Sequence, residues 1–401
     1  MIKFLVIVQD LRVSGTSEGI VSRSFLGKLR LVYPKAFIEV LYLPHFDTED
    51  ALDLLPVNIL TRHVISNKIP FYVKWVNRVA TRVFNVLYAE KYRHKQYAKC
   101  LKNIDAEAYD HIFVRSSGLG HETLLAPHNL PFLKKAILNF HDPYPYAWYA
   151  KEGANIHKNE FLRLKKMIEV VAQAKACCSP ASYLCSDLQY LYATEKPFYT
   201  LPHQFEPTVF NLDKKEQVRP KQAAFQIAYH GALMFGRNIF NVLQAYEELV
   251  QEDVFVKQQT EFVLRIKGEG VNKIKAKYKH LKNVVVLDCL DFSNSYNEQL
   301  YESDLNLILE NGPDTCNILV GKAPLLASLQ KPVLVISPPK SELRNIVGEN
   351  KYVADMNSVT DIKTKLKRLI ENRLVSQEPV FPFGDYFSVD SFEKYLNRIL
   401  S

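Results

Sequence analysis

Short apolar runs alternate with longer amphipathic patterns along the whole chain. Each run is rich in Val, Ile, Leu or Phe, which is typical of a buried strand. Strands are predicted at residues 3–8, 37–43, 111–115, 135–140 and 176–178 in the first half, and at 226–230, 261–267, 284–287, 305–309, 332–336 and 351–354 in the second. Because helical patterns separate these runs, the sequence predicts an α/β fold with two parallel sheets, hence two Rossmann-like halves.

The join between the halves lies near residues 200–211. Pro202 and Pro207 in this segment, followed by the charged stretch 212–222, are typical of an interdomain linker. A length of 401 residues also favours two domains over one core. We therefore predict a first domain at 1–203, a second at 204–385, and a final helix within 386–401 that is capped by Ser388 or Asp390.

Composition narrows the class of protein. Hydrophobic residues make up 47% of the chain and charged residues 23%, so disordered and low-complexity classes are excluded. No run of about 18 uncharged apolar residues exists, so no membrane-spanning helix is expected. The six cysteines show no C-x-x-C pair, which argues against a disulfide framework or a zinc ribbon and suits a reducing cytoplasm.

The positive charge is concentrated in one segment. Residues 72–103 hold eight Lys and Arg residues and one acid, Glu90, and so carry +7 of the formal net charge of +8. The segment lacks Gly and Pro, and its apolar residues keep the i, i+3/i+4 spacing of an amphipathic helix. The helix is either a solvated domain face or a surface that attracts an anionic membrane or a phosphorylated acceptor. Nucleic acid is disfavoured because no nucleic-acid motif accompanies the patch.

Candidate chemistry is sought in the loops that follow strands, where Rossmann-like folds bind ligands. The chain has 14 glycines in 401 residues, about half of the roughly 7% in average proteins. Six of them fall in close pairs after predicted strands, at Gly118 and Gly120, Gly231 and Gly236, and Gly268 and Gly270.

Two of these regions suit a diphosphate. Gly321, Lys322, Ala323 and Pro324 open a helical pattern, so Lys322 would add a full charge to the free amides of a helix start. The loop 229–238 follows a strand and carries Arg237, which is able to contact phosphate oxygens in a bidentate way. It matches neither Walker A nor G-x-G-x-x-G. A surface lysine and an ordinary turn are the alternative interpretations.

Three further segments hold candidate residues. His141 and Asp142 follow a strand, so His141 would act as a hydrogen-bond donor or base with Asp142 orienting it; a capped turn is the alternative. Gly15 follows the first strand without dinucleotide spacing, which disfavours a dehydrogenase. Gly268 and Glu269 lie in a turn. The scattered histidines, without H-E-x-x-H or Asp-x-Asp, give no support for a metal site.

Together these segments resemble the GT-B glycosyltransferases, in particular the retaining group-1 type, family 4. Residues 201–210 are similar to the family's "Pro-Asn-Gly-Val-Asp…Phe" marker, and 231–238 to its "Gly-Arg…Arg-Lys-Gly" loop. Residues 262–270 resemble "Val-Gly-x-Gly", and 284–309 resemble the stretch that ends "Leu-Tyr-x-x-Ala-Asp-Val". Lys322 and the triplet Lys331-Pro332-Val333 keep the spacing of "Lys-x-x-Glu-Tyr-x-Ala-x-Gly-Lys-Pro-Val", so the resemblance covers nearly the whole chain.

The chain departs from this pattern near the donor. Of the residues that usually neutralise the phosphates in this family, Arg237 and Lys322 are present. Other residues replace the family's Arg, Lys, Glu, Gly and Asn-Gly, at Ala232, Asn238, Leu325, Gln330 and His203-Gln204. The scarcity of glycine is therefore partly a loss at positions where the family uses it.

The resemblance implies a GT-B fold, with two Rossmann-like domains facing across a cleft and the last helix packing back on domain one. It implies retaining, metal-independent hexosyl transfer from a nucleotide-sugar, without a further cofactor, to a glycan or lipid-linked acceptor in surface polysaccharide biosynthesis. Arg237 and Lys322 would stabilise the diphosphate, His141 would contact the sugar, and the Gly15 loop would cover the diphosphate.

In the same resemblance Gly268, Glu269 and Asn317 would line the donor, with Glu269 or Asn317 reaching the nucleotide or the sugar. The expected location is the cytoplasm, with a peripheral position at the inner face of the membrane as a further option. The alternatives are a catalytically impaired partner that binds nucleotide-sugar or glycan, and a nucleotide-sugar epimerase.

Overall fold

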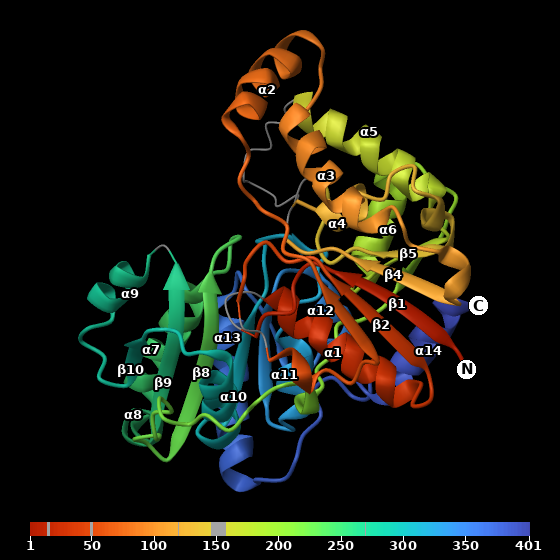
Figure 1. Ribbon diagram of the computed structural model, residues 1–401. Coiled ribbons are helices and arrows are strands. Elements are labelled where there is room, and N and C mark those ends of the chain that lie inside the picture. Colours follow the sequence, from red (N-terminus) through yellow and green to blue (C-terminus); the bar gives the residue numbers. More distant parts are fainter. Residues whose placement is uncertain (14–16, 49–50, 119, 146–157, 269) are drawn as a thin grey trace. The chain divides into compact units, whose positions relative to one another are not determined.

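The computed structural model describes residues 1–13, 17–48, 51–118, 120–145, 158–268 and 270–401 (Figure 1). The described residues form two compact units. Unit 1 comprises residues up to Val209 together with Ser388–Ser401, and unit 2 comprises Phe210–Phe387. The boundaries predicted from the sequence, after residues 203 and 385, lie close to these divisions.

Unit 1 contains a seven-stranded parallel sheet within its described residues, in the order β3-β2-β1-β4-β5-β6-β7. The strands are β1 (Lys3–Val8), β2 (Phe37–Tyr42), β3 (Ile59–Arg62), β4 (His111–Arg115), β5 (Ala136–Asn139), β6 (Ala176–Ser179) and β7 (Phe198–Thr200). The strand order reverses between β1 and β4. Ligands of open α/β sheets bind beyond the carboxyl ends of the strands at such a switch point.

The helices of unit 1 include one from each end of the chain. They are α1 (Ser17–Val32), α2 (Phe71–Val83), α3 (Tyr88–Leu101), α4 (Glu122–Leu125), α5 (Lys158–Gln173), α6 (Ser182–Leu191) and α14 (Val389–Leu400). The Ser388 hydroxyl caps α14 by accepting from the backbone N–H of Ser391 at 3.1 Å. Helix α14 packs on α1, where the Phe25 and Phe392 rings meet edge to face at 6.0 Å.

The basic segment 72–103 forms two helices, so the prediction of one helix was wrong. Helix α2 ends at Val83 and α3 begins at Tyr88. Asn85 lies between them with a φ of 55°, a left-handed conformation that Asn adopts more readily than most residues. The pattern of apolar residues continues across this break, which is why periodicity alone did not locate it.

Unit 2 repeats the same strand order in its described residues, β10-β9-β8-β11-β13-β15, and all neighbours are parallel. The strands are β8 (Phe225–Leu233), β9 (Thr260–Gly268), β10 (Val284–Leu287), β11 (Leu305–Leu309), β13 (Val333–Ser337) and β15 (Val353–Asp355), with a separate pair β12 (Thr315–Cys316) and β14 (Lys340–Ser341). The helices are α7 (Ile239–Glu252), α8 (Val254–Gln259), α9 (Val271–Lys277), α10 (Phe292–Tyr301), α11 (Ala323–Ser328), α12 (Glu342–Val347) and α13 (Val359–Val375).

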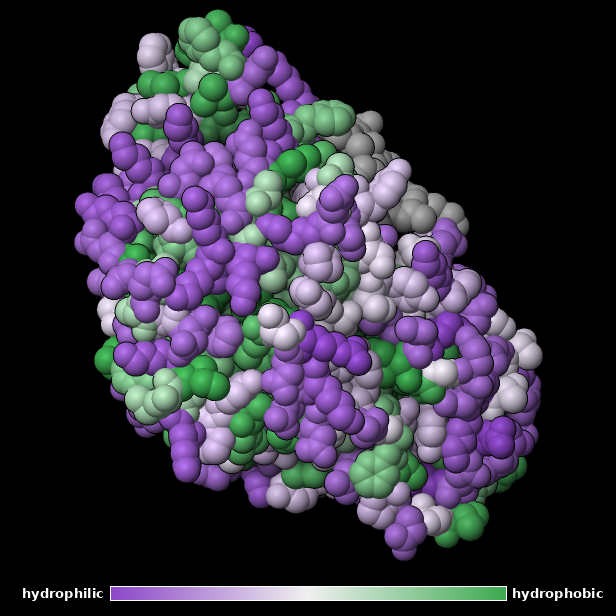
Figure 2. All heavy atoms as spheres, turned by 90° about the vertical axis from the view of Figure 1, so that its right-hand side faces the viewer, coloured by the Kyte–Doolittle hydropathy of each residue, from purple (hydrophilic) through white to green (hydrophobic). Residues whose placement is uncertain are grey.

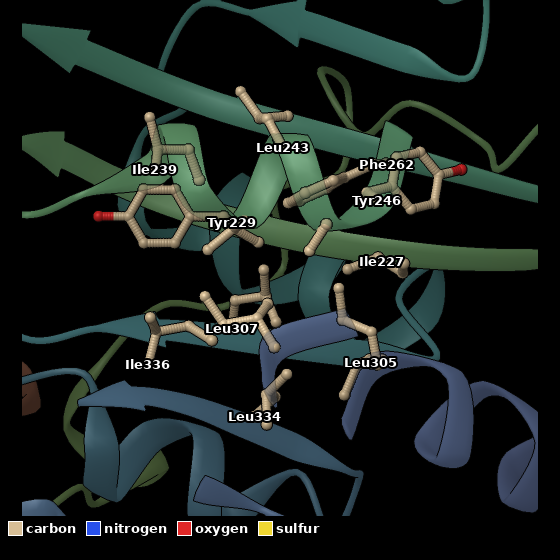
Figure 3. Close-up of a cluster of buried hydrophobic side chains, with 14 of the residues drawn as sticks. Ile227, Tyr229, Ile239, Leu243, Tyr246, Phe262, Leu305, Leu307, Leu334 and Ile336 are labelled. Carbon is tan, nitrogen blue, oxygen red and sulfur yellow. The ribbon is translucent and has the colours of Figure 1, made fainter. Parts of the chain in front are cut away.

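The core of unit 2 lies between its sheet and the helices α7 and α13 (Figure 3). Alternate residues of β8, Ile227 and Tyr229, are fully buried in it, as the period of a strand requires. Helix α7 contributes Leu243 and Tyr246, and the Tyr246 hydroxyl lies 2.8 Å from the Thr260 hydroxyl. Burial of apolar area at about 25 cal/mol per Å² makes this layer the main stabilising contribution of the unit.

One turn of unit 2 holds a residue in an unfavourable conformation. Gln330, between α11 and β13, has a φ of 54°. This is the position where the resembled family carries glycine. A left-handed conformation costs an L-residue about 1–2 kcal/mol, and glycine adopts it without that cost.

We therefore predict that Gln330→Gly raises the thermal midpoint of unit 2. The relief of strain is partly offset by the greater entropy of glycine in the unfolded chain, so a net gain of up to about 1 kcal/mol is expected. Gln330→Ala is the control, since it keeps the side-chain penalty. Equal midpoints for the glycine and alanine variants in calorimetry would contradict the prediction.

Candidate functional site

The loops after β8 and β11 meet at the switch point of unit 2. The Phe235 carbonyl accepts a hydrogen bond from the Gly312 N–H at 3.2 Å. Gly236 has a φ of 74°, and a Cβ atom there would lie 2.2 Å from the Gly312 carbonyl oxygen. Only glycine therefore satisfies both the conformation and the close approach at this position.

Arg237 joins the same two loops. Its Nε donates to the Asn311 side-chain oxygen at 3.0 Å, and its Nη1 donates to the Ala232 carbonyl at 3.1 Å. Within the described part of the chain, Arg237 forms no ion pair with a carboxylate. Its guanidinium is thus held in place, and no carboxylate of the described residues neutralises its charge.

Lys322 directly precedes α11, and its side chain reaches β8. Its ammonium group donates to the His230 carbonyl and lies 4.4 Å from the centre of the Tyr229 ring. Gly231 makes room for it, because a Cβ atom there would lie 2.6 Å from Lys322 Nζ. Burial, and then the nearby Arg237 charge, lower the pKa of Lys322 to about 7.

The structure thus brings together two of the predicted donor residues, Arg237 and Lys322. A fork of guanidinium donors beside a partly charged ammonium group suits an oxyanion such as a diphosphate. An anion bound between them would raise the pKa of Lys322 by favouring its charged form.

The other predicted donor residues are placed differently. Gly268 ends β9 with a φ of 116° and packs against the Leu233 carbonyl, so its position is explained by the backbone. Asn317 lies between β12 and α11 and is partly buried. Gly15 and Glu269 lie outside the described residues. An apolar cavity of about 160 Å³ adjoins Arg237 and is lined by side chains that include Leu233, Met234, Ile239, Phe240 and Ile274.

His141 and Asp142 follow β5 in unit 1, at the carboxyl end of that sheet. The His141 ring is buried, with Nδ1 hydrogen-bonded to the Glu18 carboxyl group and Nε2 3.2 Å from the Asn139 side-chain oxygen. The backbone N–H of His141 donates to the Ser116 hydroxyl at 2.8 Å. Glu18 and Asn139 therefore orient His141, the role expected of Asp142.

Arg115 fixes the protonation of this chain of groups. Its Nη1 donates to the Asn139 oxygen at 2.6 Å, so that oxygen is an acceptor and His141 Nε2 must carry the proton it donates. Burial lowers the pKa of His141 well below its ordinary value and raises the pKa of Glu18 to about 8. Near neutral pH both groups are uncharged, and the Glu18 hydroxyl donates to His141 Nδ1.

Several more polar groups gather at the same end of the sheet, and sequence reasoning missed most of them. We call Asp10, Glu18, Arg115, His141, Asp142 and His203 the unit 1 cluster. Arg115 is buried, stacks 4.3 Å from the centre of the Phe25 ring, and has its pKa lowered to about 10 by burial. Burial, reinforced by Glu18, raises the pKa of Asp142 to about 7. For Asp10 and Arg115 the available signal was a charged residue at or just after the end of an apolar run.

No group of three or more His, Cys, Asp or Glu residues suited to a metal ion occurs in the described parts of either unit. The metal-independence implied by the sequence stays a prediction.

The chain resembles known proteins in its three-dimensional structure. No protein-family model matches it, and no curated protein matches its sequence. It is similar to a mutant of S. aureus TarM in complex with Fondaparinux, alpha-GlcNAc-glycerol and UDP, at 12% identity, full coverage of both chains (100% each) and a TM-score of 0.62.

Two further structures are similar over almost their full length. The lipopolysaccharide outer core galactosyltransferase WaaB in its apo form has 13% identity, coverage of 100% of this chain and 99% of that chain, and a TM-score of 0.58. UDP-GlcNAc 2-epimerase from Neisseria meningitidis bound to UDP-GlcNAc has 13% identity, the same coverage of 100% and 99%, and a TM-score of 0.54. The chain has the GT-B fold. This confirms the predicted fold class, whereas the family 4 assignment stays a prediction.

The protonation of the Glu18 and His141 pair predicts a pH dependence of stability. A carboxyl group whose pKa is raised from 4.5 to about 8 on folding binds its proton more tightly in the folded state. Its contribution is therefore complete below pH 4.5 and is lost as the pH rises towards 8. The variant Glu18→Gln keeps a neutral donor towards His141. Relative to this variant, the wild type should lose about 3 kcal/mol between pH 5 and pH 8, at about 1.4 kcal/mol per pH unit.

Thermal unfolding of wild type, Glu18→Gln and the exposed control Glu195→Gln, followed from pH 5 to pH 8, measures this difference. A wild type that keeps its relative stability up to pH 8 would indicate a Glu18 carboxylate paired with a charged His141.

The lowered pKa of Lys322 predicts pH-dependent anion binding. Above pH 7 the lysine must take up a proton to bind a diphosphate in its charged form, so UDP affinity should fall by about tenfold per pH unit between pH 7 and pH 9. In this range the terminal phosphate of UDP, with a pKa of about 6, is already ionised. Titration calorimetry in buffers of different ionisation enthalpy measures the proton uptake. An unchanged slope in Lys322→Met, compared with the exposed control Lys279→Met, would refute the assignment.

Proposed function

We propose that the protein transfers a hexose from a nucleotide-sugar to a glycan or lipid-linked glycan acceptor, with retention of anomeric configuration and without a metal ion. The observation that carries this proposal is the pair Arg237 and Lys322 at the switch point of unit 2. Both are donors only, and in the described residues neither is paired with a carboxylate.

The physical argument concerns the leaving group. Cleavage of the sugar–phosphate bond leaves its electrons on the diphosphate, whose charge therefore increases in the transition state. Arg237 is held by Asn311 and Ala232, so its donors are fixed before the reaction. Lys322, with a pKa near 7, takes up its proton when the diphosphate binds, so its charge is in place before the sugar–phosphate bond breaks. The pair thus stabilises the transition state more than the bound donor, as catalysis requires.

The nucleotide is proposed to be UDP in the first instance. TarM and the N. meningitidis epimerase, which share the GT-B fold with this chain, were solved with UDP and UDP-GlcNAc, respectively. We propose that Gly268, Glu269 and Asn317 contribute to the donor site, and that the Gly15 loop, His141, Asp142 and the rest of the unit 1 cluster serve the transferred sugar and the acceptor. We further propose a role in surface polysaccharide biosynthesis.

The location is proposed to be the cytoplasm. All six cysteines are free, as is usual for proteins of a reducing compartment. In the described residues, no helix combines the length and the apolar composition needed to cross a membrane.

One observation favours a second candidate, a partner that binds nucleotide-sugar without turnover. The position where the resembled family has a donor-binding Glu is occupied by Leu325, which is buried in α11 and 7% exposed. No carboxylate from that position reaches a donor. In this alternative Arg237 and Lys322 would bind the diphosphate without promoting its release.

Turnover separates the two functions. With UDP-glucose, UDP-galactose and UDP-GlcNAc, in the presence of a glycan mixture, the wild type should release UDP at least a hundredfold faster than Arg237→Ala or Lys322→Ala. A single fixed donor for transition-state charge is typically worth about 10²–10³ in rate. The exposed residues Lys279 and Arg368 supply the controls Lys279→Ala and Arg368→Ala, which should keep full activity.

Chromatographic analysis of the sugar products completes the test. A transferred sugar of retained configuration and sensitivity to both substitutions support the proposal. Tight binding without UDP release supports the partner, and a C2-epimerised donor would replace sugar transfer with epimerisation.

A further inference from the structure

Helix α2 exposes the side that a surface helix normally buries. Phe71, Trp75, Val79 and Val83 follow one another at intervals of four residues, and therefore line one stripe of the helix. Their exposed fractions are 83%, 61%, 44% and 63%. Phe84, directly after the helix, is 70% exposed and extends the stripe.

The opposite side of α2 is attached to the protein. Val73 and Ala80 are its buried residues, and the Asn77 side-chain oxygen accepts from the backbone N–H of Ala89 at 2.9 Å, at the start of α3. The Thr81 hydroxyl donates to the Val86 carbonyl at 3.2 Å. The apolar stripe is therefore a defined face of a packed helix.

A row of positive charge runs beside the apolar stripe. Lys74, Arg78 and Arg82 also follow one another at intervals of four, and all three are exposed. None of the three forms an ion pair with a carboxylate in the described residues. The one acid of the segment, Glu90, is engaged by Arg163 at 2.5 Å. The row thus presents unneutralised cations next to exposed aromatic rings.

This combination identifies the partner by its chemistry. The structure places α2 at the far end of unit 1 from the carboxyl-terminal helix α14, and Figure 2 shows green hydrophobic side chains gathered at the upper end, where Figure 1 has α2. Phosphate headgroups satisfy Lys74, Arg78 and Arg82, while the acyl boundary beneath them accepts Phe71 and Trp75. A free polyanion would leave the valines and aromatic rings in water.

We infer that α2 docks unit 1 on the surface of an anionic lipid bilayer, with its apolar stripe inserted between the headgroups. The sequence indicated only charge attraction over residues 72–103. The structure separates the contributions, because α3 buries His94, Tyr97 and Leu101 against the protein, and so assigns the docking to α2 and Phe84. The inference does not depend on the proposed sugar transfer, and its test uses no nucleotide-sugar.

The experiment uses the full chain with Trp148→Phe, which leaves Trp75 as the only tryptophan of the original two. Vesicles of phosphatidylcholine alone are compared with vesicles that contain about 30% phosphatidylglycerol, an anionic lipid. We expect cosedimentation with the anionic vesicles and a blue shift of Trp75 emission, with quenching by brominated acyl chains. At about 0.5 M salt, where charges are screened within a few ångströms, binding should weaken but remain measurable because of the inserted rings.

Two sets of variants separate the two stripes. Phe71→Ser, Trp75→Ser and Phe84→Ser together should lower vesicle binding at least tenfold at low salt and abolish the salt-resistant part. Lys74→Glu, Arg78→Glu and Arg82→Glu together should remove the preference for phosphatidylglycerol. Tyr190→Ser and Val375→Ser are matched controls, since both residues are 89% exposed elsewhere on the surface. Circular dichroism verifies that each variant is folded.

Any one of four results would overturn the inference. One is the absence of binding to anionic vesicles at low salt. Another is binding that high salt removes completely, or that the triple serine variant retains, since then no ring is inserted. The last is a concentration-dependent dimer in sedimentation analysis that the serine variant loses, without vesicle binding, since α2 would then be a contact between two copies of the chain.

Discussion

The two large sheets of this protein are parallel and covered by helices, and this constrains where polar chemistry is found. Strands that are buried on both faces hold a charge only where it is paired, because an unpaired charge in an apolar layer costs several kcal/mol. Arg265 within β9 is paired with Glu298 at 2.6 Å, and Glu261 at the amino end of the same strand is paired with Arg219 at 2.7 Å. In both units the candidate site residues gather instead at the carboxyl ends, beside the strand at which the order of the sheet reverses.

The two units handle the cost of buried charge in different ways. In unit 2, Lys322 is buried over an aromatic ring beside Arg237, and its pKa is lowered as a result. In unit 1, Glu18 and His141 are joined by a hydrogen bond and both remain neutral, while Arg115 keeps its charge and orders them through Asn139. The first arrangement has a deficit of negative charge that a ligand is able to supply. In the second arrangement the polar groups already satisfy one another. It therefore suits the orientation of a ligand or the exchange of protons better than the binding of an anion.

Much of the fold was predictable because burial leaves a trace in the sequence. Strands β1, β4, β10 and β11 begin and end where the apolar runs do. Strands β3 and β7 were missed, since they are short, partly exposed edge strands with little apolar contrast. Arg237 and Lys322 were found from glycine and proline signals nearby. The reason for a glycine at position 231 could not be predicted, because the atom that it accommodates, Lys322 Nζ, comes from a residue far along the chain. Glu18 on α1 and Arg115 on β4 acquire their roles only from contacts with residues distant in the sequence, His141 and Asn139.

The placement of α14 has a consequence for how the protein is made. Unit 1 is finished by residues 388–401, so unit 2 is an insertion within it, and the ribosome releases the last piece of unit 1 after all of unit 2. Domains generally fold as units during synthesis. Unit 2 should therefore be complete before unit 1. Until Phe392 has been synthesised, the Phe25 ring on α1 stays uncovered. Until residues 388–401 have been synthesised, unit 1 is therefore the more vulnerable to aggregation, and α14 protects it by covering Phe25.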